Sequence, residues 1–268
     1  MIAGFFESAK HCLSLPDPGE KCVAVTELWE RLKASSLFWD DDFPVEPIGE
    51  PGRPPRPLLV EPSRVPRRRL GSSQGRAALV HAIAHIEFNA INLALDAAYR
   101  FRGMPASFYH DWISVAADEV RHFILLEKRL QDLDSGYGVL PAHNGLWEMA
   151  IKTADSCLVR MALVPRVLEA RGLDVTPAMI ERLKAVGDVE TVAALEVILA
   201  EEVRHVAVGT EWFRFCCDRE GRDPLPTFLG LLKRYHPATP KGPYNLDARY
   251  EAGFTREEMN ALSAGLSA

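Results

Sequence analysis

Apolar residues recur every three or four positions in four long stretches of the chain, at about 72–101, 106–131, 141–171 and 189–218. This period places them along one face of an α-helix, whereas a half-buried strand would alternate apolar and polar residues. Since no stretch alternates convincingly, the chain is predicted to be all-α. Four long amphipathic helices favour an antiparallel four-helix bundle.

Glycine and proline residues are expected to limit the third of these helices. It should begin after Pro141, and Gly172 together with Pro177 should interrupt it near residue 171. Glycine lowers helix propensity, and proline lacks the backbone N–H that a helix needs. A short helical insert to Val186 is then expected before the fourth helix.

Weaker patterns flank the predicted bundle. Residues 2–15 and 20–35 have helical periodicity and are predicted to be two packing helices. The stretch from Asp40 to Pro66 is dense in proline, which precludes a regular helix or a central strand, so we expect an ordered or semi-rigid wrap. Short helices are expected at 228–235 and at 255–262, the latter with a capping box. The chain is therefore predicted to form a single compact domain overall, with N-terminal helices and wrap at 1–70, the bundle at 71–220 and a C-terminal extension at 221–268.

Composition and charge narrow the class only slightly. The chain has 268 residues, of which 47% are hydrophobic, and this is enough to bury one large core. A net charge of −6 argues against a generally cationic nucleic-acid binder. The five cysteines form no C-x-x-C pair and are expected to be reduced thiols, as in a cytoplasmic protein. Residues 1–10 lack the basic start of a secretory signal, and no run approaches transmembrane length, so no membrane partner is expected.

The tetrapeptide Glu-Val-Arg-His occurs twice, at 119–122 and at 202–205. Each copy lies inside a long predicted helix, where residues three apart share one face. Each copy therefore directs a carboxylate and an imidazole to one place, and these are donors that iron(II) binds. One Glu-x-x-His would mean little, but two identical copies predict metal ligands. The alternative is that both copies are surface ion-pair segments.

Two upstream glutamates would complete a site in the bundle core. Glu87 lies on an otherwise apolar face, where an unpaired carboxylate is strongly disfavoured. It precedes Glu119 by 32 residues, and Glu169 precedes Glu202 by 33. The pattern indicates a duplicated pair of helices, each pair supplying one Glu and one Glu-x-x-His. Asp155 is an alternative to Glu169, because a glycine that could end the helix follows Glu169 closely.

Other charged or polar residues near these positions are assigned different roles. His81 and His85 are one turn apart, but His85 lies about 200° from Glu87 around the helix. Both histidines are expected to hydrogen-bond the proline-rich wrap rather than a metal. Arg121 and Arg204 lie roughly on the far side of each helix from the nearby glutamate and are assigned to ion pairing.

The two motifs and several longer strings carry a family resemblance. An acid precedes each Glu-x-Arg-His, and the resulting Asp-Glu-x-Arg-His pattern is similar to the signature of the ferritin-like di-iron carboxylate superfamily. Further strings resemble a bacterial ferritin-like family catalogued as domain of unknown function 455, over about residues 57–254. A more distant resemblance is to the tRNA 2-methylthio-isopentenyladenosine hydroxylase, which shares Glu-Ala-Arg on its third helix and Glu-x-x-His on its fourth. The strings that carry the family resemblance lie at 81–87, 168–174, 240–245 and 252–254.

This resemblance implies a ferritin-like four-helix bundle that holds two iron ions, with manganese as the alternative metal. In the superfamily, the acid before each Glu-x-x-His often holds the histidine of the opposite helix. By that analogy, Asp118 would hold His205 and Glu201 would hold His122. Four ligand carboxylates would balance two divalent ions. The implied metal ligands are Glu87, Glu119, His122, Glu169, Glu202 and His205.

The implied function is that of an O2-dependent oxidoreductase or hydroxylase. Its substrate would be an unidentified small molecule or a modified nucleoside, with dioxygen and an electron-donor protein as further partners. The alternative is a non-enzymatic, metal-handling ferritin-like protein, although the added segments at both ends would cover the bundle faces that storage cages use for assembly. A nucleic-acid partner would depend on the basic run Arg64 to Arg69, which lacks the interleaved aromatic residues that single-strand binding prefers. The alternative is that this run is a solvated turn.

Overall fold

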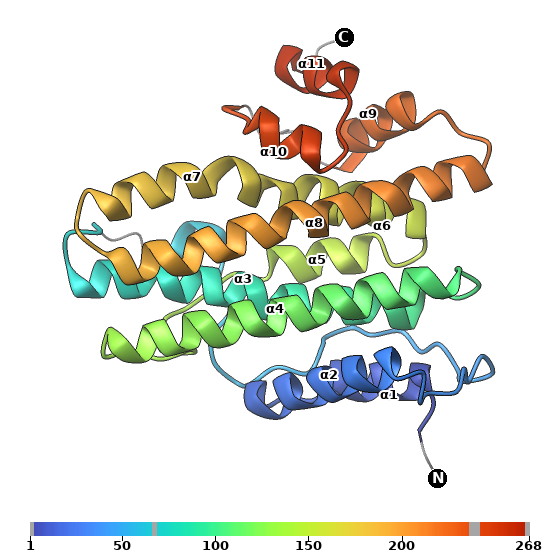
Figure 1. Ribbon diagram of the computed structural model, residues 1–268, viewed down its shortest axis with the longest axis horizontal. Helices are drawn as coiled ribbons and strands as arrows, with labels where there is room; N and C mark the ends of the chain where they lie inside the picture. Colours follow the sequence, from blue (N-terminus) through green and yellow to red (C-terminus); the bar gives the residue numbers. More distant parts are fainter. Residues whose placement is uncertain (1–2, 66–68, 236–241, 266–268) are drawn as a thin grey trace. The chain divides into compact units, whose positions relative to one another are not determined.

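The computed structural model describes residues 3–65, 69–235 and 242–265, and within these ranges every regular element is a helix (Figure 1). The predicted all-α class is therefore confirmed. The chain forms two compact units, Met1–Ile151 and Lys152–Ala268, called the first and the second unit below. The three predicted segments and the four-helix bundle stay predictions.

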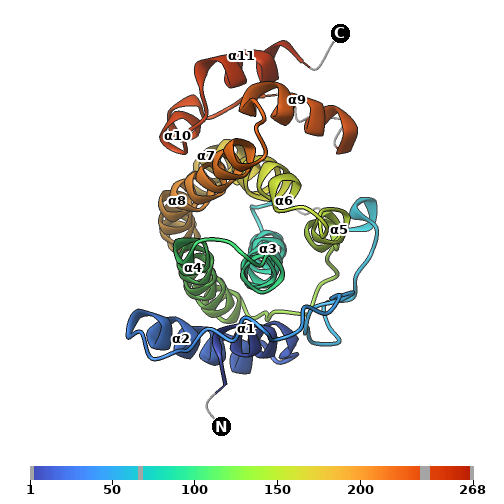
Figure 2. The same ribbon diagram turned by 90° about the vertical axis from the view of Figure 1, so that its right-hand side faces the viewer.

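The centre of the first unit is a pair of long helices, α3 (Ser73–Arg100) and α4 (Ala106–Asp132), which lie side by side (Figure 2). The side chain of Ser72 accepts a hydrogen bond from the N–H of Gly75 and caps α3. A short loop, in which Gly103 has a φ of +66°, reverses the chain, and the two helices are antiparallel. Both helices agree closely with the predicted bounds.

Two shorter helices pack on this pair. α1 (Phe5–Ser14) contacts α3, and α2 (Pro18–Lys33) contacts α4. The ammonium group of Lys21 is fully buried and donates to the carbonyl oxygens of Cys12 and Leu13, at 2.8 and 2.9 Å. These carbonyls belong to the end of α1, where no further turn of helix is present to bond them. Lys21 therefore joins the start of α2 to the end of α1.

The proline-rich segment after α2 is held by hydrogen bonds within the first unit. The N–H of Val60 donates to the carbonyl oxygen of Ala142 at 2.8 Å, and Nε1 of Trp147 donates to that of Gly49 at 2.9 Å. The proline-rich segment contains one short 3₁₀ turn among its described residues, η1 (Pro62–Arg64). These bonds agree with the ordered wrap expected from the prolines.

The predicted third helix is wrong in its first half. In place of one helix from residue 141, the structure has α5 (Gly145–Lys152), then a turn, and then α6 (Cys157–Leu163). The hydroxyl of Ser156 accepts a hydrogen bond from the N–H of Val159 at 3.3 Å. A serine that caps the backbone in this way begins a new helix.

The predicted interruption at Gly172 and Pro177 is also wrong. From α6 the helix continues through a π-helical turn, η2 (Val164–Glu169), into α7 (Ala170–Lys184). Pro165 accounts for the wide turn, because it lacks an N–H and its ring would clash with the carbonyl four residues earlier in a regular α-helix. Burial of the apolar face of α7 outweighs the low helix propensity of its glycine and proline.

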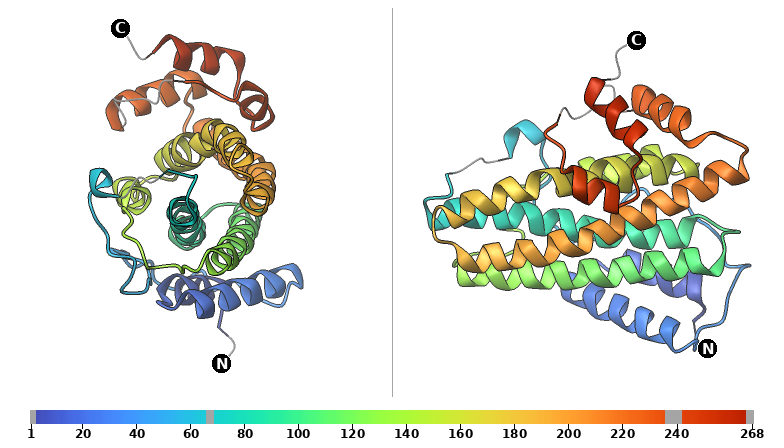
Figure 3. Two further views of the ribbon diagram at one scale, coloured as in Figure 1. Left: turned by 90° about the vertical axis from the view of Figure 1, so that its left-hand side faces the viewer. Right: turned by 45° about the horizontal axis from the view of Figure 1, so that its top comes forward.

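The long helix of the second unit is α8 (Val189–Arg219), which packs against α6, η2 and α7 (Figure 3). Asp188 caps it by accepting from the N–H of Thr191 at 3.1 Å. At Gly209, an added Cβ atom would lie 2.2 Å from ring atoms of Pro165. Glycine is therefore required for α8 to approach η2 this closely.

Three short helices end the second unit: α9 (Pro224–Tyr235), α10 (Leu246–Glu251) and α11 (Arg256–Ala264). The predicted capping box at the start of α11 is confirmed. The hydroxyl of Thr255 accepts from the N–H of Glu258 at 3.1 Å, and the Glu258 carboxylate accepts from the N–H of Thr255 at 2.8 Å. α10 was not predicted, because it lies in the stretch interrupted by proline and glycine.

Two observations bear on the cellular setting. Contrary to the expectation that no run approaches transmembrane length, α3 is long and apolar enough to cross a membrane by length and composition. Its most apolar window is 72% buried inside the structure, as in the core helix of a globular protein. All five cysteines are free and buried, which agrees with the expected reduced thiols. A cytoplasmic location stays a prediction.

Candidate metal centre

Glu87 lies in the middle of α3 on a buried apolar face. Its neighbours on that face, Val80, Ile83, Ala84 and Ile91, are all buried, and Glu87 itself is only 4% exposed. A carboxylate in such surroundings costs several kcal/mol unless hydrogen bonds or a cation compensate for the lost water. The burial expected from the apolar pattern is therefore observed.

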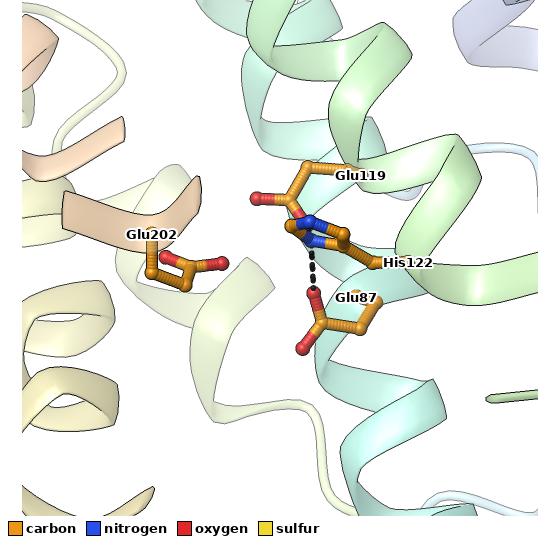
Figure 4. Close-up of side chains that lie close together, drawn as sticks. All are labelled: Glu87, Glu119, His122 and Glu202. Carbon is orange, nitrogen blue, oxygen red and sulfur yellow. Dashed lines mark hydrogen bonds and ion pairs between the residues drawn. The ribbon is translucent and has the colours of Figure 1, made fainter. Parts of the chain in front are cut away.

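The first Glu-Val-Arg-His copy, on α4, brings two more polar groups to the same place. Glu119 and His122 are one helical turn apart, and both are almost completely buried. Nδ1 of His122 lies 3.2 Å from Oε2 of Glu87 and 3.3 Å from Oε2 of Glu119 (Figure 4). The imidazole is thus held between carboxylates from two different helices.

The two carboxylates control the protonation of His122. Burial on its own lowers the pKa of this imidazole, but the hydrogen bonds and charges of Glu119 and Glu87 outweigh burial and raise the pKa to about 11. The imidazole of the metal-free protein therefore carries a proton at neutral pH and balances one of the two carboxylates. A divalent cation that displaced this proton would balance both.

These three residues could hold a metal ion. Glu87, Glu119 and His122 each offer a ligand atom, and the atoms lie within 4.8 Å of one another. Carboxylate oxygen and imidazole nitrogen suit iron(II) or manganese(II) better than a soft, thiolate-seeking metal. Glu202, also drawn in Figure 4, belongs to the second unit.

The second Glu-Val-Arg-His copy adopts the same local arrangement on α8. Glu202 and His205 are both buried, and Nδ1 of His205 lies 3.5 Å from Oε1 of Glu202. In the first copy, the corresponding distance between Glu119 and His122 is 3.3 Å. Residues three apart on a helix meet in this way, so the identical motifs give matching pairs of donors.

The second unit also contains the two candidates for the remaining carboxylate. Glu169 is the last residue of η2, which packs against α8, and its Oε2 atom is shielded from solvent. Asp155 is exposed, in the turn between α5 and α6. Whether either residue completes a centre stays a prediction.

The acids that precede the two motifs were expected to hold histidines. Asp118 accepts a hydrogen bond from Nη1 of Arg121 at 2.5 Å, and this agrees with the assignment of that arginine to ion pairing. The expected pairings of Asp118 with His205 and of Glu201 with His122 join residues of different units. They stay predictions.

His81 and His85 were expected to hydrogen-bond the proline-rich segment, and this expectation is wrong for the described residues. Both histidines contact the loop after α4 instead. Nε2 of His81 accepts from the N–H of Gly138 at 3.0 Å, and Nδ1 of His85 lies 2.9 Å from the hydroxyl of Tyr137. Burial lowers the pKa of each histidine to about 4, so both are neutral at neutral pH. Sequence reasoning missed Tyr137, although an aromatic residue between two glycines was a signal for an anchored turn.

The basic run from Arg64 to Arg69 lies partly beyond the described residues. Residues 66–68 are outside the described part of the chain, whereas Arg64, at the end of η1, and Arg69 are exposed. A nucleic-acid partner of this run stays a prediction.

Comparison with known proteins gives a family but no activity. A family model described as "Protein of unknown function (DUF455)" matches residues 14–260. An "Uncharacterized protein" of Haemophilus influenzae is 43% identical over 270 residues, which cover 97% of this chain and 94% of that protein. No solved structure matches. The chain therefore belongs to the DUF455 family of proteins of unknown function.

Proposed function

We propose that this protein is a di-metal carboxylate protein that uses two iron ions to oxidise or hydroxylate an organic substrate with dioxygen. The observation that carries the proposal is the imidazole of His122 between the buried carboxylates of Glu87 and Glu119. Burial of these two carboxylates in an apolar core destabilises the fold unless a cation or hydrogen bonds compensate for the lost water. A bound divalent cation would compensate for that cost with the donors that iron(II) and manganese(II) prefer.

The second unit would supply a matching set of donors. Glu202 and His205 repeat the arrangement of the first copy, and Glu169 precedes them as Glu87 precedes Glu119. Together, the two sets contain four carboxylates and two imidazoles, the donor set of ferritin-like di-iron bundles. Four carboxylates neutralise two divalent ions, which makes burial of the whole centre affordable.

The chain's own residues would hold the metal ions and keep water away. A bound pair of iron ions supplies the redox chemistry by which dioxygen oxidises or hydroxylates an organic molecule. Glu87, Glu119 and His122 would bind one side of the centre, and the apolar residues around Glu87 would exclude bulk water. The proton that His122 carries in the metal-free protein would leave when a cation binds.

The proposed substrate is a small molecule or a modified nucleoside, which the resemblance to a tRNA hydroxylase supports. Hydroxylation of a C–H bond by dioxygen gives one alcohol and one water, and it consumes two electrons and two protons that the substrate does not supply. An electron-donor protein is therefore a further proposed partner. A cytoplasmic location belongs to the same proposal.

Metal analysis of the purified full-length chain tests the proposal. After expression with added iron, the wild type should contain about two metal ions per chain, and Glu119→Ala and Glu202→Ala should each lose most of this metal. Glu196→Ala is the matched control, because Glu196 is also on α8 but its side chain is 54% exposed. A wild-type content near zero would contradict the di-metal proposal.

Titration with iron(II) under air separates the enzyme from the storage alternative. An oxidoreductase should stop taking up iron at about two ions per chain. Uptake far beyond that number would contradict the oxidoreductase and support a metal-handling protein. Glu119→Ala and Glu202→Ala are titrated in the same way, so that a loss of iron uptake can be assigned to the proposed ligands.

A further inference from the structure

Arg166 is a buried cation in the second unit. It lies in η2, is 1% exposed, and its guanidinium carbon lies 4.1, 4.6 and 4.7 Å from the ring centroids of Phe228, Phe254 and Phe213. Its Nη2 atom donates to Oε1 of Glu258 at 2.5 Å. The side chain therefore joins η2 to α8, α9 and α11.

Two donor atoms of this guanidinium remain unsatisfied within the described chain. Neither Nε nor Nη1 of Arg166 has a hydrogen-bond partner among the described residues. The aromatic rings attract the positive charge over their faces, but they provide no acceptor in the plane of the N–H groups. A buried charged donor without an acceptor is strongly unfavourable, so another group should bond these atoms.

A small cavity lies next to Arg166. It measures about 10 Å³, which is the room of a single water-sized sphere, and Arg249 and Tyr244 also line it. The rest of its wall is apolar. The apolar wall residues are Val167, Phe228, Leu232 and Leu262.

Each of the two arginines that line the cavity is paired with a carboxylate. Arg249 pairs with Asp174, between Nη2 and Oδ2, at 2.6 Å, and Arg171 lies 3.7 Å from the same carboxylate. Arg214 donates to the carbonyl oxygen of Gly253, a neutral acceptor. Burial and the charge of Arg214 both act to lower the pKa of Arg166, while Glu258 opposes them. Among the described arginines, only Arg166 and Arg249 line the cavity, and each is paired with one carboxylate, Glu258 or Asp174.

These features distinguish an anion from a water molecule as the occupant. A buried water needs acceptors for its own hydrogens as well as donors, and apart from Tyr244 the wall consists of two arginines and apolar side chains. An anion needs donors only, and Nε and Nη1 of Arg166 are two donors without an acceptor in the described chain. The size of the cavity excludes a complete sulfate or phosphate ion.

We propose that this cavity is a binding site for one small inorganic anion of about the size of chloride, held by Nε and Nη1 of Arg166. Arg249 contributes a second positive charge to the site. Since Arg166 and Glu258 already connect η2 to α11, the bound anion stabilises the attachment of the C-terminal helices to η2. The site is distinct from the proposed metal centre and does not depend on it.

Thermal unfolding of the full chain in different sodium salts tests the site. At equal ionic strength, chloride and bromide should raise Tm by about 3 °C relative to gluconate, which is too large for the cavity. Leu262→Phe would fill the cavity without removing any arginine or carboxylate, and it should abolish the difference between the salts. An equal Tm in all three salts would overturn the proposal, as would a chloride effect that survives in Leu262→Phe.

Crystals grown in sodium bromide give an independent test that requires no variant. An anomalous peak beside Nε and Nη1 of Arg166 is the expected result. A cavity that contains only water in these crystals would overturn the proposal.

Discussion

Nδ1 of His122 lies 3.2 Å from Oε2 of Glu87, a residue 35 positions earlier in the chain and on the neighbouring helix. Glu119, one turn before His122, contacts the same nitrogen atom. A proton on this imidazole therefore carries the positive charge that a metal ion would bring. The competition between proton and metal makes the behaviour of the centre depend on pH.

Metal affinity is expected to rise with pH. The pKa of His122 is raised to about 11 in the metal-free protein, so the imidazole is protonated over the whole range below that value. If one proton leaves for each metal bound there, the affinity increases about tenfold per pH unit. Calorimetric titration with manganese(II) in buffers of different ionisation enthalpy measures the released proton directly.

The stability of the metal-free protein should change in the opposite direction. A raised histidine pKa contributes stability that is complete below the unfolded value of about 6.5 and is lost as the pH rises through about 11. His122→Gln should remove both the proton release on metal binding and this loss of stability at high pH. Metal binding without proton release in the wild type would show that the imidazole is neutral in the metal-free centre.

Removal of the negative charge of Glu87 should lower the pKa of His122. Glu87→Gln keeps the size of the side chain but replaces a carboxylate with an amide, so the pKa of His122 should fall below its wild-type value. Titration of the metal-free protein followed by histidine NMR measures this pKa, and metal affinity should fall in the same variant. Glu196→Gln, at an exposed position, should change neither quantity. A His122 pKa that stays near 11 in Glu87→Gln would mean that Glu119 alone determines it.

The sequence predicted the long helices well because their signals are local. The apolar period defines α3 and α8 to within a few positions, and in the structure the side chains of Ser72 and Asp188 cap the two helices. The break before Ser156 was missed because the apolar period continues across it. The π-helical turn at Pro165 was missed because the apolar period runs through it, and the interruption was expected instead at Gly172 and Pro177, where the helix continues.

Part of the candidate site could also be predicted from local signals. The burial of Glu87 follows from its apolar neighbours, and the meeting of Glu119 with His122 follows from the helical period. The partners of His81 could not be predicted, because the loop that contacts it is 57 residues away in the chain. A periodic pattern identifies the buried face of a helix but not the loop that covers it.

His81 should make the protein sensitive to acid. Burial lowers its pKa to about 4, whereas the unfolded chain has a value near 6.5. The folded state therefore resists protonation, and the free energy of unfolding should decrease as the pH falls from about 6.5 to about 4, by roughly 2–3 kcal/mol for this group. His81→Gln retains an acceptor for the N–H of Gly138 and should reduce this dependence, as measured by urea unfolding at several pH values. It should not abolish the dependence, because burial also lowers the pKa of His85 to about 4. His11→Gln, at an exposed histidine of α1, should leave the dependence as in the wild type.

The contact between Gly209 and Pro165 should decide how well Glu169 is placed. In Gly209→Ala the new Cβ would lie 2.2 Å from the proline ring, so η2 must move away from α8. The substitution gains about 1 kcal/mol of helix propensity, but overpacking costs roughly 1–3 kcal/mol, so the variant should be no more stable than the wild type. If Glu169 is a ligand, the variant should also bind metal more weakly. Gly172→Ala is the matched control, because no atom lies within 4 Å of its added Cβ, and it should raise the free energy of unfolding with metal content unchanged. Normal metal content in Gly209→Ala, with the expected loss of packing, would indicate that Glu169 does not contribute to the centre.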